Sequence, residues 1–318
     1  MTTSALFSCR AAVVDWGTSN LRVWLLGQGG RVLAHAASAD GADGLSAADF
    51  EASLRRILTR LGAVWPETQL LPVVVCGMAG ARNGWREAGY VAVPATPDEC
   101  FSRALQVTAA RLDVRILPGL SRLEGQYADV MRGEETQLAG FISQEPGFTG
   151  CVGLPGTHCK WVSFEQGKIV RFQTVMTGEL FSLLSKQSVL RHVIGNHTIF
   201  SPDAPAFTEA VLEGVEHAGR LSCAIFSVRA AGLLKGRQGS EAAARLSGLL
   251  IGHEMNAMFP ASEQNTPIVL GAEGALAPLY ARALTLIGRN FHLVDVQDLT
   301  LAGLRAASRQ LFGAIFEE

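Results

Sequence analysis

The sequence predicts an α/β protein made of two related domains, and three observations support this prediction. A pattern occurs twice, in residues 12–34 and 151–172: an extended run, a turn containing Gly-Thr, a second extended run, a glycine-containing turn and a third extended run. Short β-branched runs also alternate with stretches of helical periodicity in both halves, as is typical of α/β proteins. Finally, 318 residues are enough for about two domains, each with its own core.

In the first half, the three extended runs of the repeat are followed by a helix predicted over 47–61. Its apolar residues have the spacing of a helix that packs by one face: Phe50, Leu54, Ile57, Leu58 and Leu61. The β-branched run 72–76 is typical of a buried parallel strand. A loop over 77–85, a helix over 97–111 and a strand over 114–117 complete this half. The resulting order, β-β-β-α-β-α-β, is that of the ribonuclease-H-like module, in which an antiparallel hairpin lies at the edge of a parallel sheet.

The second half repeats this order. Three strands are predicted within 151–175, followed by helices over 177–190, 205–214, 221–234 and 239–258. The remaining predicted elements are a strand over 267–270, a helix over 273–287, a strand over 292–296 and a terminal helix from Gln297. The turn-rich segment 144–150, with two glycines and a proline, is the predicted domain boundary. We therefore expect two ribonuclease-H-like domains with an interdomain cleft.

The composition restricts the class of protein. With 48% hydrophobic and 18% charged residues, the chain is expected to be compact and globular. Its formal net charge of −2 argues against nucleic acid or an acidic membrane surface as a partner. No apolar run reaches the roughly 18 residues that span a bilayer, and no secretory signal pattern opens the chain. Six scattered cysteines without a C-x-x-C pair argue against structural zinc and a disulfide framework, so we expect a cytoplasmic location.

The first Gly-Thr turn, Asp15-Trp-Gly-Thr-Ser-Asn20, has the residue types of a metal and phosphate site. Asp15 at the end of a strand can hold Mg²⁺ through its water shell. Gly17 allows phosphate to approach the backbone, and Thr18, Ser19 and Asn20 add donors. The alternative is an ordinary hairpin whose polar side chains satisfy the turn, but the duplication favours a functional role.

The second Gly-Thr turn has no aspartate, because Leu154-Pro155 stands in that place. This asymmetry suggests that one hairpin serves the metal and the other serves phosphate. The expected phosphate-side residues of the second turn are Gly156, Thr157, His158 and Lys160. For Lys160 a solvated strand residue is an equal alternative. Neither a P-loop nor a dinucleotide-binding glycine motif is present.

A third motif, Arg132-Gly-Glu-Glu135, begins a predicted helix. The helix dipole favours ionised carboxylates at this position, and an ionised carboxylate can accept a hydroxyl proton during phosphoryl transfer. The alternative is that both glutamates merely offset the dipole on a solvated first turn.

Two loops follow predicted buried strands, where open α/β sheets place ligands. In the loop 77–85, Arg82 and Asn83 could bind hydroxyls or a carboxylate, with Trp85 as an apolar wall. A plain connector is the alternative. The segment Gly271-Ala272-Glu273 is suggestive of a helix start beneath an adenine ring.

Several phrases of the sequence together resemble the 2-dehydro-3-deoxygalactonokinase family of the sugar kinase/Hsp70/actin superfamily. They run in the same order over nearly the whole chain. The phrases are Asp15-Trp-Gly-Thr-Ser-Asn-Leu-Arg, Gly77-Met, Gly84-Trp, Met131-Arg-Gly-Glu-Glu-Thr-Gln-Leu, Pro155-Gly-Thr-His-Cys-Lys-Trp-Val, Thr174-Val-Met-Thr-Gly-Glu-Leu, Val228-Arg-Ala and Leu246-Ser-Gly-Leu-Leu-Ile-Gly. The phrases that begin at Met131 and at Pro155 are specific to the family.

The resemblance implies ATP-dependent phosphorylation of the 6-hydroxyl of 2-dehydro-3-deoxy-D-galactonate, with Mg²⁺ as cofactor. It also implies actin-like ATPase domains, 1–148 with the metal hairpin and sugar-acid site and 149–318 with the second hairpin and adenosine site. Residues 15–20 fall on the first phosphate motif, 155–160 on the second and 271–273 near the adenosine motif. Glu134 falls at the catalytic carboxylate, with Glu135 as the alternative one position away.

The acceptor of such a reaction carries a carboxylate that needs a cationic seat. The candidate arginines are Arg22, Arg82, Arg132 and Arg229. We favour Arg132, because it adjoins the expected base. Other expected substrate residues are Met78, Asn83 and Trp85. Mg·ATP is expected to bridge the two hairpins while the domains close over the sugar acid.

Three rival functions remain at this point. A nucleotide or polyphosphate hydrolase of the same superfamily would use water as the attacking group. A non-catalytic sugar sensor would need a basic helix-turn-helix segment, which the sequence lacks. A kinase for another sugar acid, such as the gluconate epimer, is compatible with all of these residues. The partners expected are therefore a small sugar acid and ATP, and a homodimer is left open.

Overall fold

The computed structural model describes residues 7–123, 128–259 and 265–313. By packing, the chain divides into two units. Unit 1 comprises Met1–Phe148, Phe164–Arg171 and Val296–Glu318, and unit 2 comprises Thr149–Ser163 and Phe172–Asp295. This division differs from the expected domains 1–148 and 149–318 in giving the last helix to unit 1. The assignment of actin-like domains to those two ranges stays a prediction.

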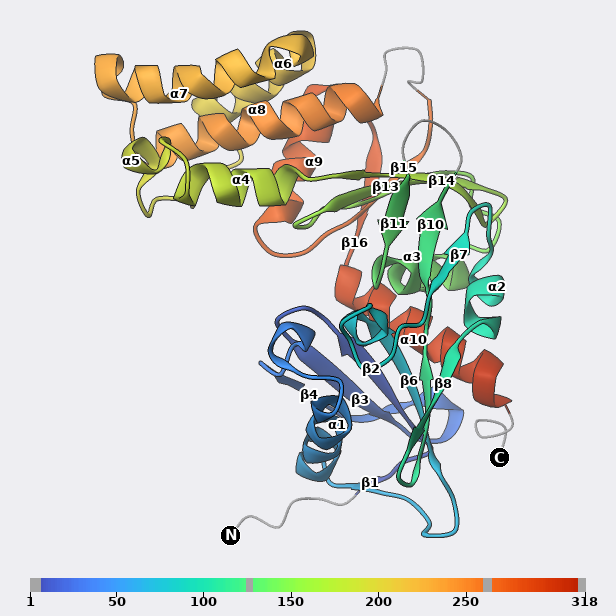
Figure 1. Ribbon diagram of the computed structural model, residues 1–318. Coiled ribbons are helices and arrows are strands. Elements are labelled where there is room, and N and C mark those ends of the chain that lie inside the picture. Colours follow the sequence, from blue (N-terminus) through green and yellow to red (C-terminus); the bar gives the residue numbers. More distant parts are fainter. Residues whose placement is uncertain (1–6, 124–127, 260–264, 314–318) are drawn as a thin grey trace. The chain divides into compact units, whose positions relative to one another are not determined.

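Unit 1 is built on a six-stranded mixed sheet with the order β4-β3-β2-β6-β9-β8 (Figure 1). Its strands are β2 (Ala11–Trp16), β3 (Leu21–Leu26), β4 (Val32–Ser38), β6 (Leu71–Gly77), β8 (Leu105–Ala109) and β9 (Leu112–Ile116). Strands β2, β3 and β4 are antiparallel, whereas β2, β6 and β9 are parallel. An antiparallel hairpin thus lies at the edge of a parallel sheet, and the predicted ribonuclease-H-like order is confirmed.

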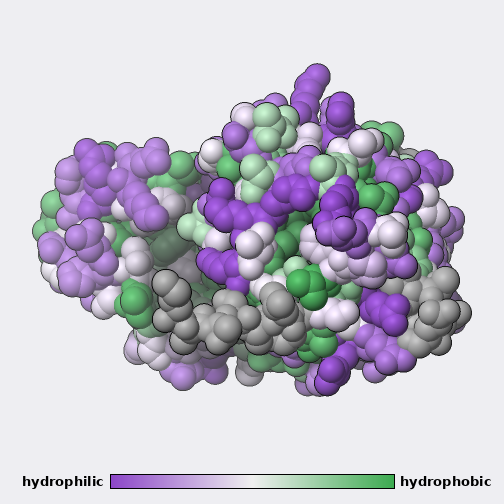
Figure 2. All heavy atoms as spheres, turned by 90° about the horizontal axis from the view of Figure 1, so that it is seen from below, coloured by the Kyte–Doolittle hydropathy of each residue, from purple (hydrophilic) through white to green (hydrophobic). Residues whose placement is uncertain are grey.

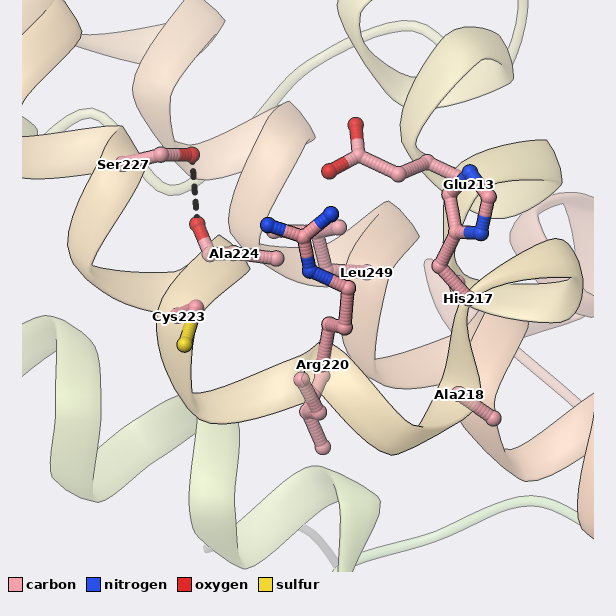
Figure 3. A pocket seen from close by; sticks show the side chains of 10 residues that line it. Glu213, His217, Ala218, Arg220, Cys223, Ala224, Ser227 and Leu249 are labelled. Carbon is pink, nitrogen blue, oxygen red and sulfur yellow. Dashed lines mark hydrogen bonds between the residues drawn. The ribbon is translucent and has the colours of Figure 1, made fainter.

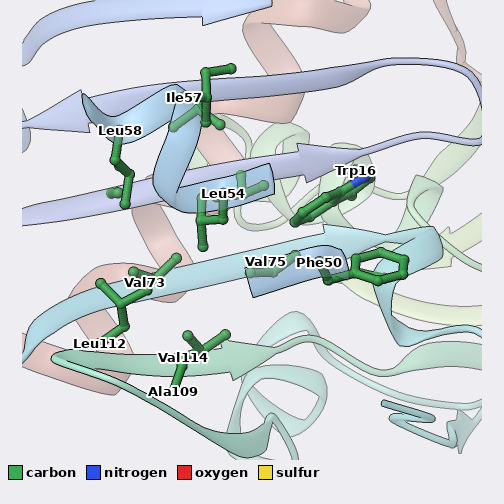
Figure 4. Close-up of a cluster of buried hydrophobic side chains, with 14 of the residues drawn as sticks. Trp16, Phe50, Leu54, Ile57, Leu58, Val73, Val75, Ala109, Leu112 and Val114 are labelled. Carbon is green, nitrogen blue, oxygen red and sulfur yellow. The ribbon is translucent and has the colours of Figure 1, made fainter. Parts of the chain in front are cut away.

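Alternate residues of the central strands pack against different helices, because successive side chains of a strand point to opposite faces. Val14 and Val75 face helix α1 (Asp49–Arg60), whose predicted apolar residues lie in the same cluster (Figure 4). Val13 and Val74 belong to a second cluster with the helices α3 (Glu134–Gln144) and α10 (Val296–Phe312). By the same alternation, Asp15 projects towards the face that carries α3.

Helices α3 and α10 approach each other closely at two glycines. A Cβ atom on Gly303 would collide with the carbonyl oxygen of Thr136, and one on Gly140 would collide with that of Leu299. The lack of side chains at these two positions therefore allows the C-terminal helix to pack against α3, as Figure 1 shows. Because α3 begins at the expected base, this packing supports the helix that carries it.

The predicted helix over 97–111 is wrong in its second half. Helix α2 (Pro97–Ser102) begins with a capping box of Thr96 and Glu99, but the chain then forms strand β8, which pairs antiparallel with β9. The strand has the alternating burial of a period of two, with Val107 buried and its neighbours exposed. The alternation in Leu105-Gln-Val-Thr-Ala109 is the signal that was available in the sequence.

A small sheet of unit 1, with the order β11-β10-β7, was not predicted. It comprises β7 (Tyr90–Ala92), β10 (Gly119–Arg122) and β11 (Asp129–Met131). The other short elements of unit 1 are the strand pair β1 (Phe7–Ser8) and β5 (Ala63–Val64) and the 3-10 turns η1 (Gln28–Gly30), η2 (Ala42–Gly44) and η3 (Met78–Gly80).

Unit 2 repeats the same strand order in a five-stranded sheet, β14-β13-β12-β15-β16. The strands are β12 (Gly150–Leu154), β13 (Cys159–Glu165), β14 (Lys168–Val175), β15 (Ile268–Gly271) and β16 (Phe291–Val294). Strands β12, β15 and β16 are parallel. The ends of β13 and β14 that form their connecting hairpin are counted with unit 1. The repeat recognised in the sequence therefore corresponds to a repeat of topology.

The helices of unit 2 are α4 (Thr177–Lys186), α5 (Arg191–Ile194), α6 (Pro205–Glu216), α7 (Leu221–Lys235), α8 (Ser240–Met258) and α9 (Leu276–Leu286), with the turn η4 (Ala218–Arg220). The predicted helix over 177–190 ends earlier, at Lys186. The helix predicted from 273 begins instead at Leu276, because Gly274 has a φ of +59° and forms a turn before it.

The surface seen in Figure 2 carries hydrophilic and hydrophobic residues interspersed with one another. Within the described residues, no helix combines the length and the apolar character that crossing a membrane requires.

Candidate active site

Asp15, Cys76 and Glu135 meet on the α3 face of the unit 1 sheet. Asp15 on β2 is the register partner of Cys76 on β6, and the Cys76 thiol donates to Asp15 Oδ1 over 3.7 Å. Burial first, and then the charges of Asp15 and Glu135, raise the pKa of the Cys76 thiol. The carboxyl groups of β2 and α3 thus approach the same thiol from two elements.

Asp15 forms an ion pair with Arg22, its antiparallel neighbour on β3. Arg22 Nη2 lies 2.6 Å from Asp15 Oδ2, and Arg22 Nε donates to the same oxygen over 2.9 Å. The Asp15 side chain remains 14% exposed and that of Arg22 30%. Sequence reasoning assigned Arg22 to the substrate, and the structure brings it to Asp15 because cross-strand partners share one face of the sheet.

The turn after Asp15 is fixed by backbone hydrogen bonds. Gly17 N–H donates to Asn20 O over 2.8 Å, and the N–H groups of Ala42 and Asp43 each donate over 3.0 Å, to the carbonyl oxygens of Gly17 and Thr18. The side chains of residues 18–20 are exposed. Their hydroxyl and amide groups are therefore available at the surface of unit 1, as the phosphate-site prediction requires.

Glu134 and Glu135 occupy different environments at the start of α3. The Arg132 N–H donates to Glu134 Oε2 over 3.1 Å, and Glu134 is partly exposed. Glu135 is only 4% exposed, and it accepts from the Gly133 N–H over 2.6 Å and from the Thr136 hydroxyl over 3.2 Å. The two residues are therefore not equivalent candidates for contact with a substrate.

The expectation that the helix dipole keeps both carboxylates ionised is wrong for Glu135. Burial, and to a smaller extent the charge of Glu134, raises the pKa of Glu135 to about 8. Removal from water disfavours the ionised form more strongly here than the dipole favours it. At neutral pH the Glu135 carboxyl is accordingly mostly protonated.

Arg132 presents a guanidinium group that is only partly used. Its Nη2 donates to Gly89 O over 2.8 Å, and its guanidinium carbon lies 4.5 Å from the ring centroid of Tyr90. Within the described structure, its Nε and Nη1 are buried and have no hydrogen-bond partner. A buried cation with unpaired N–H groups is costly unless an anion completes it. The small sheet produces this arrangement, because Arg132 directly follows β11 and Tyr90 begins β7.

The loop 77–85 distributes its predicted residues between surface and core. Arg82 and Asn83 are exposed, and Met78 is partly exposed. Trp85 is 9% exposed and packs with Phe50 and Trp16, its ring centroid 6.1 and 6.2 Å from theirs. The structure thus assigns the Trp85 ring to the core that Figure 4 draws around Phe50, and its role as a wall for the substrate stays a prediction.

In unit 2 the second Gly-Thr turn lies against the start of α4. The Glu179 N–H donates to Thr157 O over 2.9 Å, and the His158 ring is 2.5 Å from the Glu179 carboxylate. A Cβ on Gly178 would collide with the carbonyl oxygen of Gly156, so glycine is needed for this approach. The turn is therefore positioned by a helix N-terminus, a feature that favours anion binding.

Two predicted residues of this turn differ in burial. Thr157 and His158 are exposed, so their side chains can meet a ligand. Lys160 is 4% exposed, and its ammonium group donates to His158 O over 2.9 Å. The interpretation of Lys160 as a solvated strand residue is thus wrong. Its assignment to phosphate stays a prediction.

The expected adenosine segment follows β15. Gly271 is buried at the end of the strand, and the Ala272 N–H donates to Val294 O over 3.2 Å. Ala272 is 6% exposed, whereas Glu273 is exposed. Among these three residues, the Glu273 side chain is therefore the one accessible to a ligand.

A cavity of about 190 Å³ lies elsewhere in unit 2, among α6, η4, α7 and α8 (Figure 3). Its lining includes Glu213, His217, Arg220 and Cys223. Glu213 is already paired with Arg245 over 2.7 Å. None of the residues predicted from the sequence lines this cavity, so it contributes nothing to the predicted chemistry.

Asp15 is the residue of unit 1 on which the predicted Mg²⁺ site depends. No cluster of three or more His, Cys, Asp or Glu side chains suited to a metal occurs in the described part of the chain. In phosphoryl-transfer sites, however, Mg²⁺ usually binds through one or two carboxylates together with water and substrate phosphates. The partly exposed carboxylate of Asp15, next to the exposed turn 18–20, fits that pattern.

Sequence reasoning missed three neighbours of these residues. Tyr90 stacks on Arg132, Cys76 contacts Asp15, and Glu179 pairs with His158. Glu179 lies inside the phrase 174–180 that carried the family resemblance, so a signal for it existed. Tyr90 depends on a pairing between β7 and β10, which no local pattern announces.

Comparisons with known proteins agree with one another. The family model of 2-keto-3-deoxy-galactonokinase matches residues 15–307. A probable 2-dehydro-3-deoxygalactonokinase of Rhizobium meliloti (strain 1021) is 39% identical over 312 residues, covering 98% of this chain and 99% of the relative. The 2-dehydro-3-deoxygalactonokinase of Escherichia coli (strain K12) is 34% identical over 307 residues, covering 94% and 97%.

A solved structure gives the same result. The crystal structure of a Sinorhizobium meliloti protein, described as a 2-dehydro-3-deoxygalactonokinase, matches with a TM-score of 0.90 at 39% identity. The match covers 95% of this chain and 99% of that protein. The similarity therefore extends through both units.

Proposed function

The chain belongs to the 2-keto-3-deoxy-galactonokinase family, and we propose that it transfers a phosphoryl group from ATP to the 6-hydroxyl of 2-dehydro-3-deoxy-D-galactonate. Membership makes it a sugar-acid kinase, an enzyme of the transferase class. The proposal adds the acceptor hydroxyl, the residues that act and their roles.

The observation that carries the proposal is the start of α3, where a partly exposed carboxylate directly follows a partly unsatisfied guanidinium. Among the described residues, two buried nitrogens of the Arg132 guanidinium have no hydrogen-bond partner, and the Arg132 backbone N–H donates to the Glu134 carboxylate. A sugar acid has a carboxylate at one end and a hydroxyl at the other. We assign the carboxylate to Arg132 and the hydroxyl to Glu134.

Glu134 is the proposed general base. It accepts the proton of the 6-hydroxyl as that oxygen attacks the transferred phosphoryl group and the bond to the leaving ADP breaks. Glu135 is unsuited to this role, because its carboxyl is buried, mostly protonated at neutral pH and engaged by Gly133 and Thr136. Glu135 instead satisfies donors at the helix start.

The proposed phosphate and metal residues of unit 1 are Asp15 and the turn 17–20. Asp15 would hold Mg²⁺ through water, and the ion would offset the negative charge of the phosphates. Arg22 orients the Asp15 carboxylate through two contacts to Oδ2. Thr18, Ser19 and Asn20 supply exposed donors.

In unit 2, we propose that Gly156, Thr157 and His158 bind phosphate and that the segment 271–273 contacts the adenosine. The contacts of the turn with α4 support the first assignment. Lys160 acts by holding the backbone of His158, through its hydrogen bond to that carbonyl, and by adding positive charge beneath the turn.

The test is ADP release by the purified chain with Mg·ATP in three parallel reactions. One contains no acceptor, one contains 2-dehydro-3-deoxy-D-galactonate, and one contains its gluconate epimer. The proposal expects ADP formation that depends on the galactonate compound. Comparable rates with the epimer would widen the substrate range to both sugar acids. ADP release at the same rate with and without either sugar acid would contradict the kinase proposal and indicate a nucleotide hydrolase.

A further inference from the structure

Glu254 is a buried carboxyl group that none of the proposed steps uses. It lies on α8 and is fully buried. The Trp161 indole N–H donates to its Oε1 over 2.7 Å, and the Tyr280 hydroxyl donates to its Oε2 over 2.8 Å. The Thr177 hydroxyl also donates to Oε2. One side chain of α8 therefore receives hydrogen bonds from β13, α4 and α9.

These donors lead to the second Gly-Thr turn by two short routes. Thr177 is the first residue of α4, whose residues Gly178 and Glu179 lie against the turn. On the other route, the Cys159 sulfur lies 2.8 Å from the Tyr280 hydroxyl, and the thiol donates to Gly156 O over 3.5 Å. The turn and the helix that supports it are thus both linked to Glu254.

Tyr280 also connects Glu254 with the predicted adenosine segment of unit 2. Tyr280 is 1% exposed on α9, the helix that begins shortly after the segment 271–273. Glu254 accordingly links the predicted phosphate turn and the helix behind the predicted adenosine segment within a single network.

The network is specific in its geometry because burial makes every unpaired polar group costly. Burial raises the pKa of Glu254, and hydrogen bonds from Thr177, Trp161 and Tyr280 oppose that effect. Each donor must keep its place for the carboxyl group to remain satisfied. An apolar residue at position 254 would leave three donors without an acceptor.

We propose that Glu254 is a positioning residue for nucleotide binding, which fixes the turn 156–158 relative to α4 and α9 without touching the ligand. This inference rests on the proposed function, since it assumes that the turn binds the phosphates of a nucleotide.

The test compares nucleotide affinity with stability in the full chain. Glu254→Gln keeps the size of the side chain but cannot accept from all three donors at their present positions. We expect the Kd of Mg·ADP, measured by calorimetry, to rise about tenfold, equivalent to about 1.4 kcal/mol. The KM of the sugar acid should change less than twofold.

Three further variants separate positioning from general stability. Thr177→Val removes one donor and should weaken Mg·ADP binding in the same direction, whereas Thr177→Ser retains the hydroxyl and should restore it. Glu213→Gln is the matched control, because it breaks another partly buried contact of α8, the ion pair between Arg245 on α8 and Glu213 on α6. It should lower the melting temperature without changing the Kd.

The outcomes are distinct. If Glu254→Gln and Thr177→Val lower the melting temperature but leave the Kd within twofold of wild type, the positioning role is wrong. If Glu254→Gln does not fold, the comparison of Mg·ADP binding by Thr177→Val and Thr177→Ser tests the proposal by itself. If the wild-type chain itself does not bind Mg·ADP, the proposed function fails rather than this inference.

Discussion

Glu134 and Glu135 are neighbours in sequence, but burial gives them different chemistry. Sequence reasoning could locate the pair, because two acidic residues follow a glycine at a helix start. It could not separate them, since the direction in which each side chain points depends on the packing of α3 against the sheet. Burial raises the pKa of Glu135 to about 8, and this pKa is the physical difference between the two residues.

The first prediction concerns these two residues. Glu134→Gln should lower kcat by at least about 100-fold and leave the Kd of ATP nearly unchanged, since a general base acts in the transition state. Glu135→Gln is the matched control and should lower kcat less than about tenfold. Steady-state kinetics and nucleotide titration measure both. A large loss of kcat confined to Glu135→Gln would identify Glu135, and not Glu134, as the general base.

The second prediction concerns pH and stability. Between pH 4.5 and about pH 8, the folded chain retains a proton on Glu135 that the unfolded chain has released. The free energy of unfolding from this group therefore falls as pH rises through that window, by at most about 1.4 kcal/mol per pH unit. Glu254, whose pKa burial also raises, contributes with the same sign.

The difference between wild type and Glu135→Gln isolates Glu135, because Glu254 is present in both. Urea unfolding should show that the stability of wild type relative to the variant decreases from about pH 5 to about pH 8. A difference that is constant with pH would mean that Glu135 is ionised in the folded chain.

The third prediction concerns Arg132. Arg132→Ala should raise the KM of the sugar acid at least tenfold and change that of ATP less than twofold, because a charge-assisted contact contributes roughly 1.5–3 kcal/mol. Arg86→Ala, at an exposed position just after the loop 77–85, is the control and should change little. If Arg132→Ala changed the KM of both substrates equally, Arg132 would not be the residue that binds the carboxylate of the sugar acid.

At the scale of elements, the long buried strands and the helices were easier to predict than the short strands. Buried β-branched runs marked β6 and β15, and apolar spacing marked α1, since local sequence determines these patterns. Strand β8 was predicted as part of a helix, because the residues before it begin with a true capping box. The sheet of β7, β10 and β11 was missed because its strands are short and pair over long distances in the chain.

The fourth prediction tests the packing of α3 on α10. Gly303→Ala places a Cβ against the carbonyl oxygen of Thr136, so the free energy of unfolding should fall by about 1–3 kcal/mol. Gly147→Ala is the control, because no atom lies within 4 Å of its added Cβ. It should stay within about 0.5 kcal/mol of wild type. Equal stability of the two variants would show that the helices can separate without cost.

At the scale of the whole molecule, the duplicated pattern predicted the duplicated topology. Both sheets have three strands in hairpin order followed by two parallel ones. The positions of Asp15 and the second turn within these modules could be inferred from the same pattern, and that of Glu134 from the acidic pair at a helix start. The partners Arg22, Tyr90, Glu179 and Glu254 could not, because each depends on which strands and helices become neighbours in three dimensions.

The final prediction tests the central claim, that the chain phosphorylates a sugar acid on its 6-hydroxyl. The measurement is phosphorus NMR of the products formed from Mg·ATP and 2-dehydro-3-deoxy-D-galactonate. The account predicts a phosphate monoester whose phosphorus couples to the protons on carbon 6, formed in an amount equal to ADP. Inorganic phosphate as the product that accompanies ADP, or an ester at another carbon, would contradict it.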